Sequence, residues 1–206
     1  MGIVTAPSTN AVPRFRFPGG IWHHVALGDD AAIDEVVRAI VDRIASVGDR
    51  YARERGLMRA ELGRQAREAA SHGVTALYLA EQVTSGLPVT ATLSVHAPTI
   101  RLSPSLGTDP GAVMDVFLEG RGLAASEEAR AARFTTAEGE AFREIVPSAE
   151  GTPPSVTARF WVTVPGTKTL VPLQFGSPFV DLAAPLVTLF TAIVASVTWE
   201  DASLTP

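Results

Sequence analysis

The chain has no cysteine, and its four histidines show no metal-ligand spacing. The lack of cysteine excludes disulfides, thiolate nucleophiles and cysteine metal sites. His23 and His24 are adjacent in a segment with strand character, where neighbouring side chains point to opposite faces and cannot share one ion. His72 and His96 lie at the ends of predicted elements. We therefore expect no metal site and no cofactor.

Motifs for nucleophilic catalysis and for phosphate binding are also missing. No Gly-x-Ser-x-Gly elbow occurs. Glu119 to Gly122 contains a lone Gly-x-Gly that is typical of a surface turn. The acidic residues Asp29, Asp30 and Asp34 fit the start of a helix, where the helix dipole favours negative charge. The sequence therefore favours a non-enzymatic protein over an enzyme, and it offers no catalytic residues.

The charge balance gives no field that would attract nucleic acid. The chain has 17 basic and 22 acidic residues and a net charge of −5. Arginines gather between Arg50 and Arg67, but acidic residues alternate with them and Tyr51 is the only aromatic residue there. This pattern predicts a solvated, ion-paired helix face, and we expect no nucleic-acid partner.

Long apolar runs are rare, and the longest candidate is residues 182–197, which carry no charge. A membrane-spanning helix needs about 20 apolar residues, so the run is short. A buried core helix is the favoured interpretation, with a tail anchor and a partner-binding helix as alternatives. Residues 1–10 lack a signal-peptide pattern, so we expect a cytoplasmic protein without a membrane span. The use of arginine in place of lysine favours a bacterial source.

The periodicity predicts an α+β fold, in which an antiparallel β-sheet is flanked by a long N-terminal helix and an apolar C-terminal helix. We expect a flexible arm over residues 1–13, one α+β domain over 14–200 and a short tail over 201–206. Residues 31–71 predict one helix or two, because Gly48, Gly56 and Gly63 interrupt the apolar stripe. The strands are predicted within the segments 15–27, 74–83, 89–95, 113–118, 135–146 and 155–175, the last folding about a Pro165-Gly166 turn.

Tryptophans are the candidate binding residues. In the closing hairpin Trp161 shares one face with Thr157, Arg159 and Thr163, and we predict that this face is polar. This position is unusual, because a tryptophan more often anchors the core. Trp22 and His23 occupy a second predicted strand. We take Trp161, Arg159, Trp22 and His23 as candidates for binding a partner, with His24 as a further polar group.

The closing segment resembles the PsbP-like fold family, which includes DcrB-type bacterial proteins and type VI secretion effector chaperones. The match lies in "VTARFWVTVPGTKTLVPLQF" followed by "PLVTLFTAIVASVTW", a final hairpin and apolar helix, together with the opening strands, the helix and the hairpin before it. The resemblance implies an antiparallel sheet flanked by helices and an adaptor, chaperone or accessory role. No catalytic residue is implied by it.

Three functional hypotheses follow from the sequence. The first is a non-enzymatic binding protein, a chaperone-like adaptor that uses an apolar sheet face or groove to bind a protein partner. The second is a small-molecule-binding protein or enzyme with a pocket between sheet and helices. The third is a structural subunit of a larger assembly, including a homo-oligomer.

Overall fold

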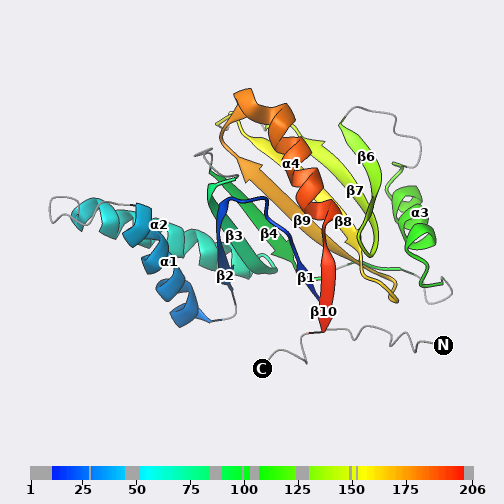
Figure 1. Cartoon of the computed structure of the whole chain (residues 1–206), viewed down its shortest axis with the longest axis horizontal. Helices are drawn as coiled ribbons and strands as arrows, with labels where there is room; N and C mark the ends of the chain where they lie inside the picture. The colour runs from blue at the N-terminus through cyan, green and yellow to red at the C-terminus, as the bar shows by residue number, and fades with distance from the viewer. Residues whose placement is uncertain are drawn as a thin grey trace. The chain divides into compact units, whose positions relative to one another are not determined.

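The computed structural model describes residues 11–27, 29–44, 52–83, 90–98, 100–102, 107–123, 130–148, 150–151 and 153–201. It has the predicted α+β fold, with α-helices and antiparallel strands (Figure 1). The chain divides into two compact units. The small unit is Pro18–Ala97, and the large unit combines Met1–Phe17 with Pro98–Pro206.

The small unit contains three antiparallel strands in the order β2-β3-β4 and two helices. Its elements are β2 (Ile21–Ala26), α1 (Asp30–Ile44), α2 (Ala52–Ser71), β3 (Val74–Gln82) and β4 (Ala91–His96). The predicted β3–β4 hairpin is confirmed, although its connection over residues 84–88 lies outside the described residues. The segment 31–71 forms two helices; Gly48 also lies outside the described residues.

Helix α1 forms where the sequence provides both a cap and an apolar stripe. The Asp29 carboxylate accepts a hydrogen bond from Ala31 N at 2.9 Å, which satisfies a free amide of the first turn. The apolar residues of α1 then repeat at three- and four-residue steps and are buried: Ile33, Val37, Ile40 and Val41. They form one core with residues of the neighbouring elements, namely Val25, Leu27, Ala66 and Val74. The helical spacing therefore determines which face of α1 is covered.

Helix α2 has the predicted ion-paired surface. Arg64 pairs with Glu61 and Glu68, and Arg67 pairs with Asp30 and Asp34 of α1. The helix ends at Ser71, and Gly73 takes a φ of 78°, which favours glycine after a helix. The pairs are exposed, so their role is to keep this face solvated.

The large unit has a strand order of β5-β9-β8-β7-β6, antiparallel throughout. The strands are β5 (Ile100–Arg101), β6 (Ala131–Thr136), β7 (Gly139–Val146), β8 (Val156–Thr163) and β9 (Thr169–Ser177). The β8–β9 hairpin confirms the prediction, with Gly166 at a φ of 70° in its turn. The predicted strand 135–146 is instead a β6–β7 hairpin, because Ala137 and Glu138 form a turn.

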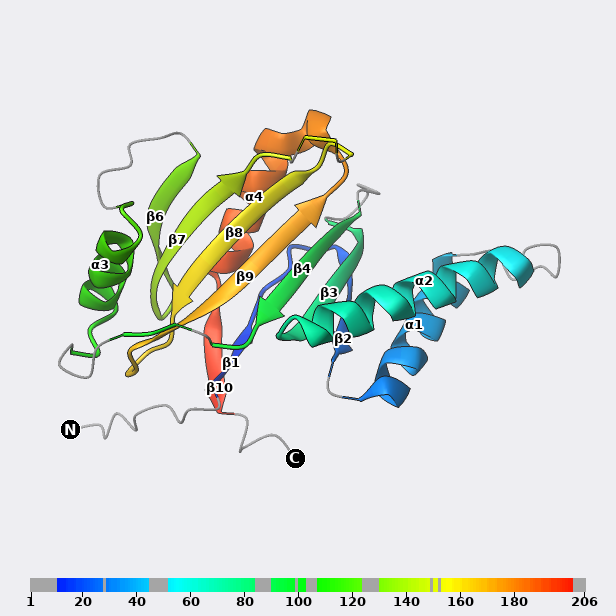
Figure 2. The ribbon, with the colours of Figure 1, turned by 180° about the vertical axis from the view of Figure 1, so that it is seen from behind.

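The apolar C-terminal segment packs on one face of these strands. A short 3₁₀ turn, η2 (Val180–Leu182), leads into α4 (Ala183–Ala195), which lies across the strands (Figures 1 and 2). Phe190 is fully buried and stacks on Phe175, which in turn contacts Phe160 edge to face. No helix of the described residues is long and apolar enough to cross a membrane.

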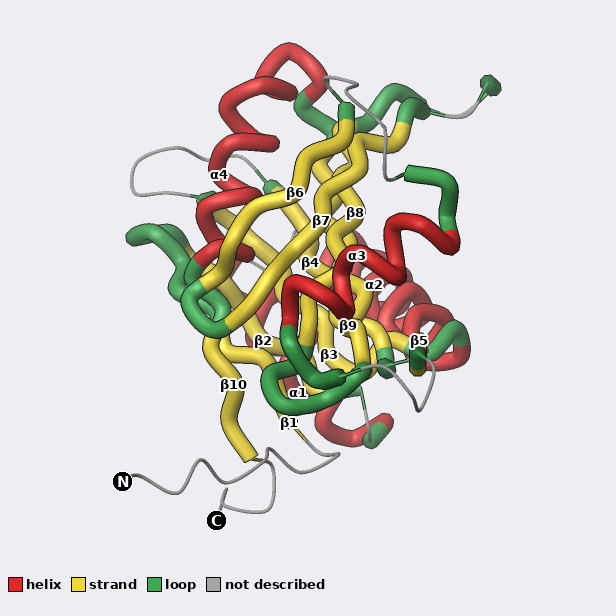
Figure 3. Tube along the Cα trace, turned by 90° about the vertical axis from the view of Figure 1, so that its right-hand side faces the viewer, coloured by secondary structure: helices red, strands yellow, loops and turns green. Residues whose placement is uncertain are grey.

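The opposite face of the strands is covered by a helix where the sequence predicts a strand. Figure 3 shows α4 on one side of the strands and α3 (Pro110–Gly120) on the other. The predicted strand 113–118 is wrong, because Asp109 caps the amide of Ala112 and Pro110 begins the helix. The buried side chains of α3 follow helical spacing: Val113, Met114, Phe117 and Leu118.

A two-stranded ribbon joins the two ends of the described chain. β1 (Ala11–Arg14) pairs antiparallel with β10 (Thr198–Asp201), and Arg14 Nε lies 2.7 Å from Glu200 Oε2. Residues 11–13, which the sequence suggests as part of the arm, thus belong to a strand. Residues 1–10 and 202–206 lie outside the described residues.

Candidate functional site

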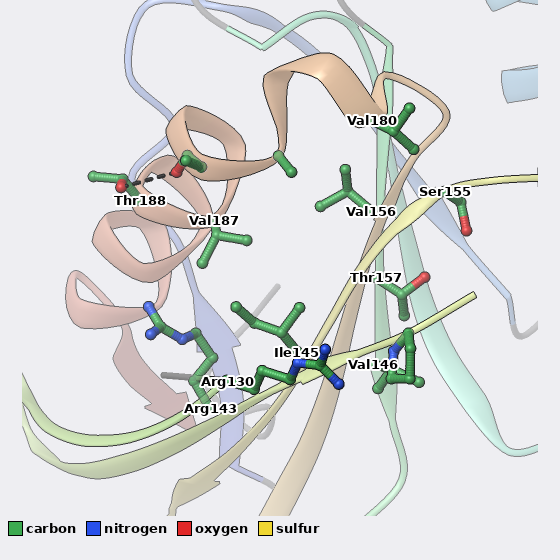
Figure 4. A pocket seen from close by; sticks show the side chains of 13 residues that line it. Arg130, Arg143, Ile145, Val146, Ser155, Val156, Thr157, Val180, Val187 and Thr188 are labelled. Carbon is green, nitrogen blue, oxygen red and sulfur yellow. Dashed lines mark hydrogen bonds between the residues drawn. The ribbon is translucent and has the colours of Figure 1, made fainter. Parts of the chain in front are cut away.

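A cavity of about 470 Å³ lies between the start of α4 and the ends of β7 and β8. We call it the α4 cavity, and Figure 4 shows the side chains around it. η2 and α4 form one wall, and the strands with the start of β6 form the other. The lining residues are Arg130, Arg143, Ile145, Val146, Pro147, Ser155, Val156, Thr157, Val180, Ala183, Ala184, Val187 and Thr188.

Most of the lining is aliphatic. Val180 and Val187 come from the helical wall, and Ile145 and Val156 come from the strands (Figure 4). The pairing of Ile145 with Ala158 places Ile145 on the side of β7 that faces α4. A cavity of this volume with a mainly apolar lining falls in the range typical of small-molecule sites.

Two apolar side chains just before α4 are exposed. Phe179 and Val180 precede α4, and their relative exposures are 39% and 42%. Val180 lines the α4 cavity, whereas Phe179 is its neighbour in the chain and is not part of the lining. Isolated exposed apolar side chains are ordinary, so only Val180 adds to the apolar surface of the cavity.

The polar groups of the lining can bind and orient a ligand but cannot act as a general base. They comprise two guanidiniums and the side chains of Ser155, Thr157 and Thr188, and the lining contains no histidine or carboxylate. The Thr188 hydroxyl donates to Ala184 O at 3.0 Å within α4 (Figure 4). The described part of the chain contains no group of three potential metal ligands.

Arg143 is the most constrained polar group at the α4 cavity. Its Nη1 donates to Thr191 Oγ1 at 2.9 Å, and the guanidinium points toward α4 (Figure 4). Its Nε is buried and has no hydrogen-bond partner among the described residues. Burial lowers the pKa of Arg143, because its cation loses hydration.

Arg130 adds a second positive charge on the same side of the sheet. The carbonyl oxygen of Arg130 accepts a hydrogen bond from Ile145 N at 2.7 Å, and Ala132 pairs with Arg143. Alternation along the strand therefore places both arginines on the side that faces α4. Neither forms an ion pair with any acidic residue that the structure describes, whereas Arg133, on the other side, contacts Asp115 and Glu140.

Two of the residues suggested by the sequence, Trp161 and Arg159, lie in β8 on the side away from α4. Trp161 is 6% exposed and contacts Phe117 and Phe142 beneath α3. The Arg121 guanidinium lies 4.6 Å from the ring centre. Arg159 is exposed and donates to Gln174 Oε1 at 3.2 Å. Neither residue lines the α4 cavity.

The other two residues, Trp22 and His23, lie in β2 of the small unit. His23 Nε2 is 2.7 Å from Glu81 Oε1 on the neighbouring strand, and both side chains are largely buried. Trp22 is half-buried, and the ring of His24 lies against that of Tyr78. This arrangement joins β2 to β3, and neither Trp22 nor His23 lines the α4 cavity.

Sequence reasoning missed Arg143 although a signal was present. In β7 the inward-facing positions are Ala141, Arg143 and Ile145, so one arginine interrupts an apolar face. A charged residue at an inward position of a strand is costly unless it is paired or solvated. That pattern marks a candidate site without any catalytic motif.

Comparison with known proteins does not assign the chain to a family. No protein-family model matches it, and the search of curated proteins finds no match.

Proposed function

We propose that this chain is a non-enzymatic binding protein that holds the apolar part of a ligand in the α4 cavity. This is the second of the three sequence hypotheses, in its non-catalytic form. The observation that carries it is the cavity of about 470 Å³ with a mainly aliphatic lining, to which the exposed Val180 contributes. Apolar surface of this kind binds ligands by releasing water from both partners.

The neutral fluorophore N-phenylnaphthylamine tests this function, because its emission rises when it enters an apolar site. Purified protein is titrated with the probe, alongside two variants with the same substitution in α4. Ala184→Trp places a large side chain in the lining, whereas Ala192→Trp adds it at an exposed position outside the lining. Binding to wild type and Ala192→Trp, with loss in Ala184→Trp, supports the function.

Two results would contradict the proposed function. One is no emission change with wild-type protein, and the other is equal binding by wild type and both variants. Circular dichroism of each variant shows whether the fold is retained, so that loss of binding is attributed to the filled cavity. If Ala184→Trp unfolds, Thr188→Trp serves as a second variant that fills the cavity, because Thr188 lines it and is exposed on α4.

A protein-binding role is the second candidate, supported by exposed apolar residues in the small unit. Leu57 and Met58 are adjacent in α2, with relative exposures of 64% and 38%. Affinity capture from the source cells tests the role with the Leu57→Glu variant and, as a control, Ala60→Glu at a nearby exposed position. A partner that is retained by Ala60→Glu and lost with Leu57→Glu supports the role; equal retention contradicts it.

We also retain membership of the PsbP-like fold family as a proposal. The β8–β9 hairpin followed by α4 supports it, because this arrangement corresponds to the hairpin and apolar helix on which the resemblance rests. An experimental structure tests it: superposition on family members should match the β8–β9 hairpin together with α4. A different strand order would overturn it.

A further inference from the structure

We propose that Arg143 anchors the acidic head of an amphiphilic ligand, a carboxylate with an aliphatic chain, whose chain occupies the α4 cavity. This inference rests on the proposed function and specifies the class of ligand. It assigns the charged group of the ligand to one residue and the apolar part to the surrounding wall. The expected ligand is a small amphiphile rather than a peptide or another macromolecule.

The hydrogen bonds of Arg143 leave one edge of its guanidinium without a partner among the described residues. Nη1 is engaged by Thr191, whereas Nε and Nη2 make no hydrogen bond to any described residue. Nε and Nη2 form the edge that binds both oxygens of a carboxylate. Arg64 does this within the same chain: its Nε and Nη2 donate to Glu61 Oε2 and Oε1 at 3.0 and 2.7 Å. Arg143 therefore has the same edge that Arg64 uses to bind Glu61, but no acidic residue of the described chain is bound to it.

The charges of the lining favour an anion. The lining carries Arg130 and Arg143 and no acidic side chain. The lowered pKa of Arg143 reflects burial without a compensating carboxylate, and a bound anion would restore that compensation. A hydrogen bond to a charged group contributes more than a neutral one, which makes the head group a source of selectivity.

The surrounding wall suits an unbranched aliphatic chain. Val187 and Val180 on one wall and Ile145 and Val156 on the other provide side chains without hydrogen-bonding atoms (Figure 4). Thr188, whose hydroxyl could bind a polar ligand, already donates to Ala184 O. Against these four aliphatic side chains, a ligand chain with several polar groups would lose hydration without finding new partners.

The strand pairing argues against a peptide as the ligand. β7 pairs with β6 and β8, and β8 pairs with β7 and β9, so the two strands that form most of the wall opposite α4 have partners along each edge. An extended peptide that binds by strand addition needs a free edge for its backbone. An amphiphile needs no such partner, because its only polar group is the head.

Competition between two ligands that differ only in their heads tests the inference. Dodecanoate, kept below its micelle-forming concentration, and dodecanol, kept below its solubility limit, are titrated as competitors of N-phenylnaphthylamine bound to wild-type protein. We expect dodecanoate to bind at least about tenfold more tightly, the smaller effect expected for a hydrogen bond to a charged group. Arg143→Met should remove this preference and leave dodecanol binding unchanged. Arg38→Met, at an exposed arginine of α1, should retain the preference.

Each outcome bears on either the inference or the proposed function. If dodecanol and dodecanoate bind wild type equally, or Arg143→Met retains the preference, the assignment of Arg143 is wrong while the apolar site stands. If neither ligand nor the probe binds, the proposed function itself fails. If an N-acetylated Leu-Val-Val tripeptide displaces the probe at lower concentration than dodecanoate, the ligand is a peptide and the inference is overturned. Dodecanol binding by Arg143→Met shows that the variant is folded.

Discussion

Arg143 of β7 and Thr191 of α4 are joined by a hydrogen bond of 2.9 Å, in which Nη1 donates to the threonine hydroxyl. The same hydroxyl donates to Val187 O at 2.7 Å, so its donor and one acceptor position are both in use. The bond holds the guanidinium in a fixed orientation against the helix. A long side chain that is already ordered loses less conformational entropy when it binds a ligand.

The first prediction concerns the stability of the ligand-free protein without this arginine. Arg143→Met should not lower the melting temperature, because it removes a partly buried charge that has no acidic partner among the described residues. Thermal unfolding of wild type and variant, monitored by circular dichroism, measures the two melting temperatures. A decrease of more than about 4 °C, which corresponds to over 1 kcal/mol in a chain of this size, would contradict this prediction and show that Arg143 stabilises the folded protein.

The second prediction concerns the pH response of α2. Hydrogen bonds from Arg64 and Gln65 lower the pKa of Glu61 from 4.5 to about 2. Because the folded-state pKa lies below the ordinary value, the pair stabilises the folded state above pH 4.5. This stabilisation is lost as the pH falls through about 2.

Carbon-detected NMR titration of the Glu61 carboxyl checks that shift. In Arg64→Gln the pKa of Glu61 should return toward 4.5, because the hydrogen bond from Arg64, the largest cause of the shift, is removed. A Glu61 pKa at or above 4.5 in the intact protein would contradict the ion pairs described for this face of α2.

The third prediction concerns the core of the large unit. Phe190→Ala should lower the free energy of unfolding by about 3–5 kcal/mol, because it leaves a cavity beneath α4. The ring it removes is fully buried and lies 4.5 Å from that of Phe175 between centroids. Denaturant unfolding gives the change. Phe179→Ala, which truncates an exposed ring, should stay within about 0.5 kcal/mol. Equal effects would mean that α4 does not pack as described.

The fourth prediction compares two glycines under one substitution. A Cβ at Gly20 would lie 2.2 Å from the carbonyl oxygen of Gln82, so Gly20→Ala should destabilise the small unit by about 1–3 kcal/mol. A Cβ at Gly56 meets nothing within 4 Å, so Gly56→Ala should stabilise α2 by about 0.5–1 kcal/mol. Denaturant melts of both variants would be expected to shift in opposite directions; a shift in the same direction would contradict one of the two environments.

The fold was predictable where local pattern and pairing agree. Alternation in residues 156–163 and a Pro165-Gly166 turn are sufficient to predict the β8–β9 hairpin. The three- and four-residue spacing after Asp29 likewise predicts α1. The prediction of a strand over 113–118 did not use Pro110 as a helix start, although proline, which breaks the interior of a helix, is favoured in its first turn. Proline therefore indicates the start of a helix in one position and an interruption of it in another.

The candidate site was less predictable because it depends on contacts between distant segments. Trp161 shares its face of β8 with polar residues in the sequence. In the structure its ring is covered by α3, which lies some forty residues earlier in the chain. The α4 cavity likewise exists only after α4 packs on β7 and β8. The sequence shows an arginine between Ala141 and Ile145, but the register of β6 with β7 is needed to place Arg130 on the same side.

NMR mapping of the dodecanoate site on isotope-labelled protein tests the central claim most directly. We expect the largest amide shift changes at Ile145, Val180 and Val187, which line the α4 cavity, and none above background in α2. The largest changes at Leu57 and Met58, or changes spread evenly over both units, would contradict a ligand site beneath α4.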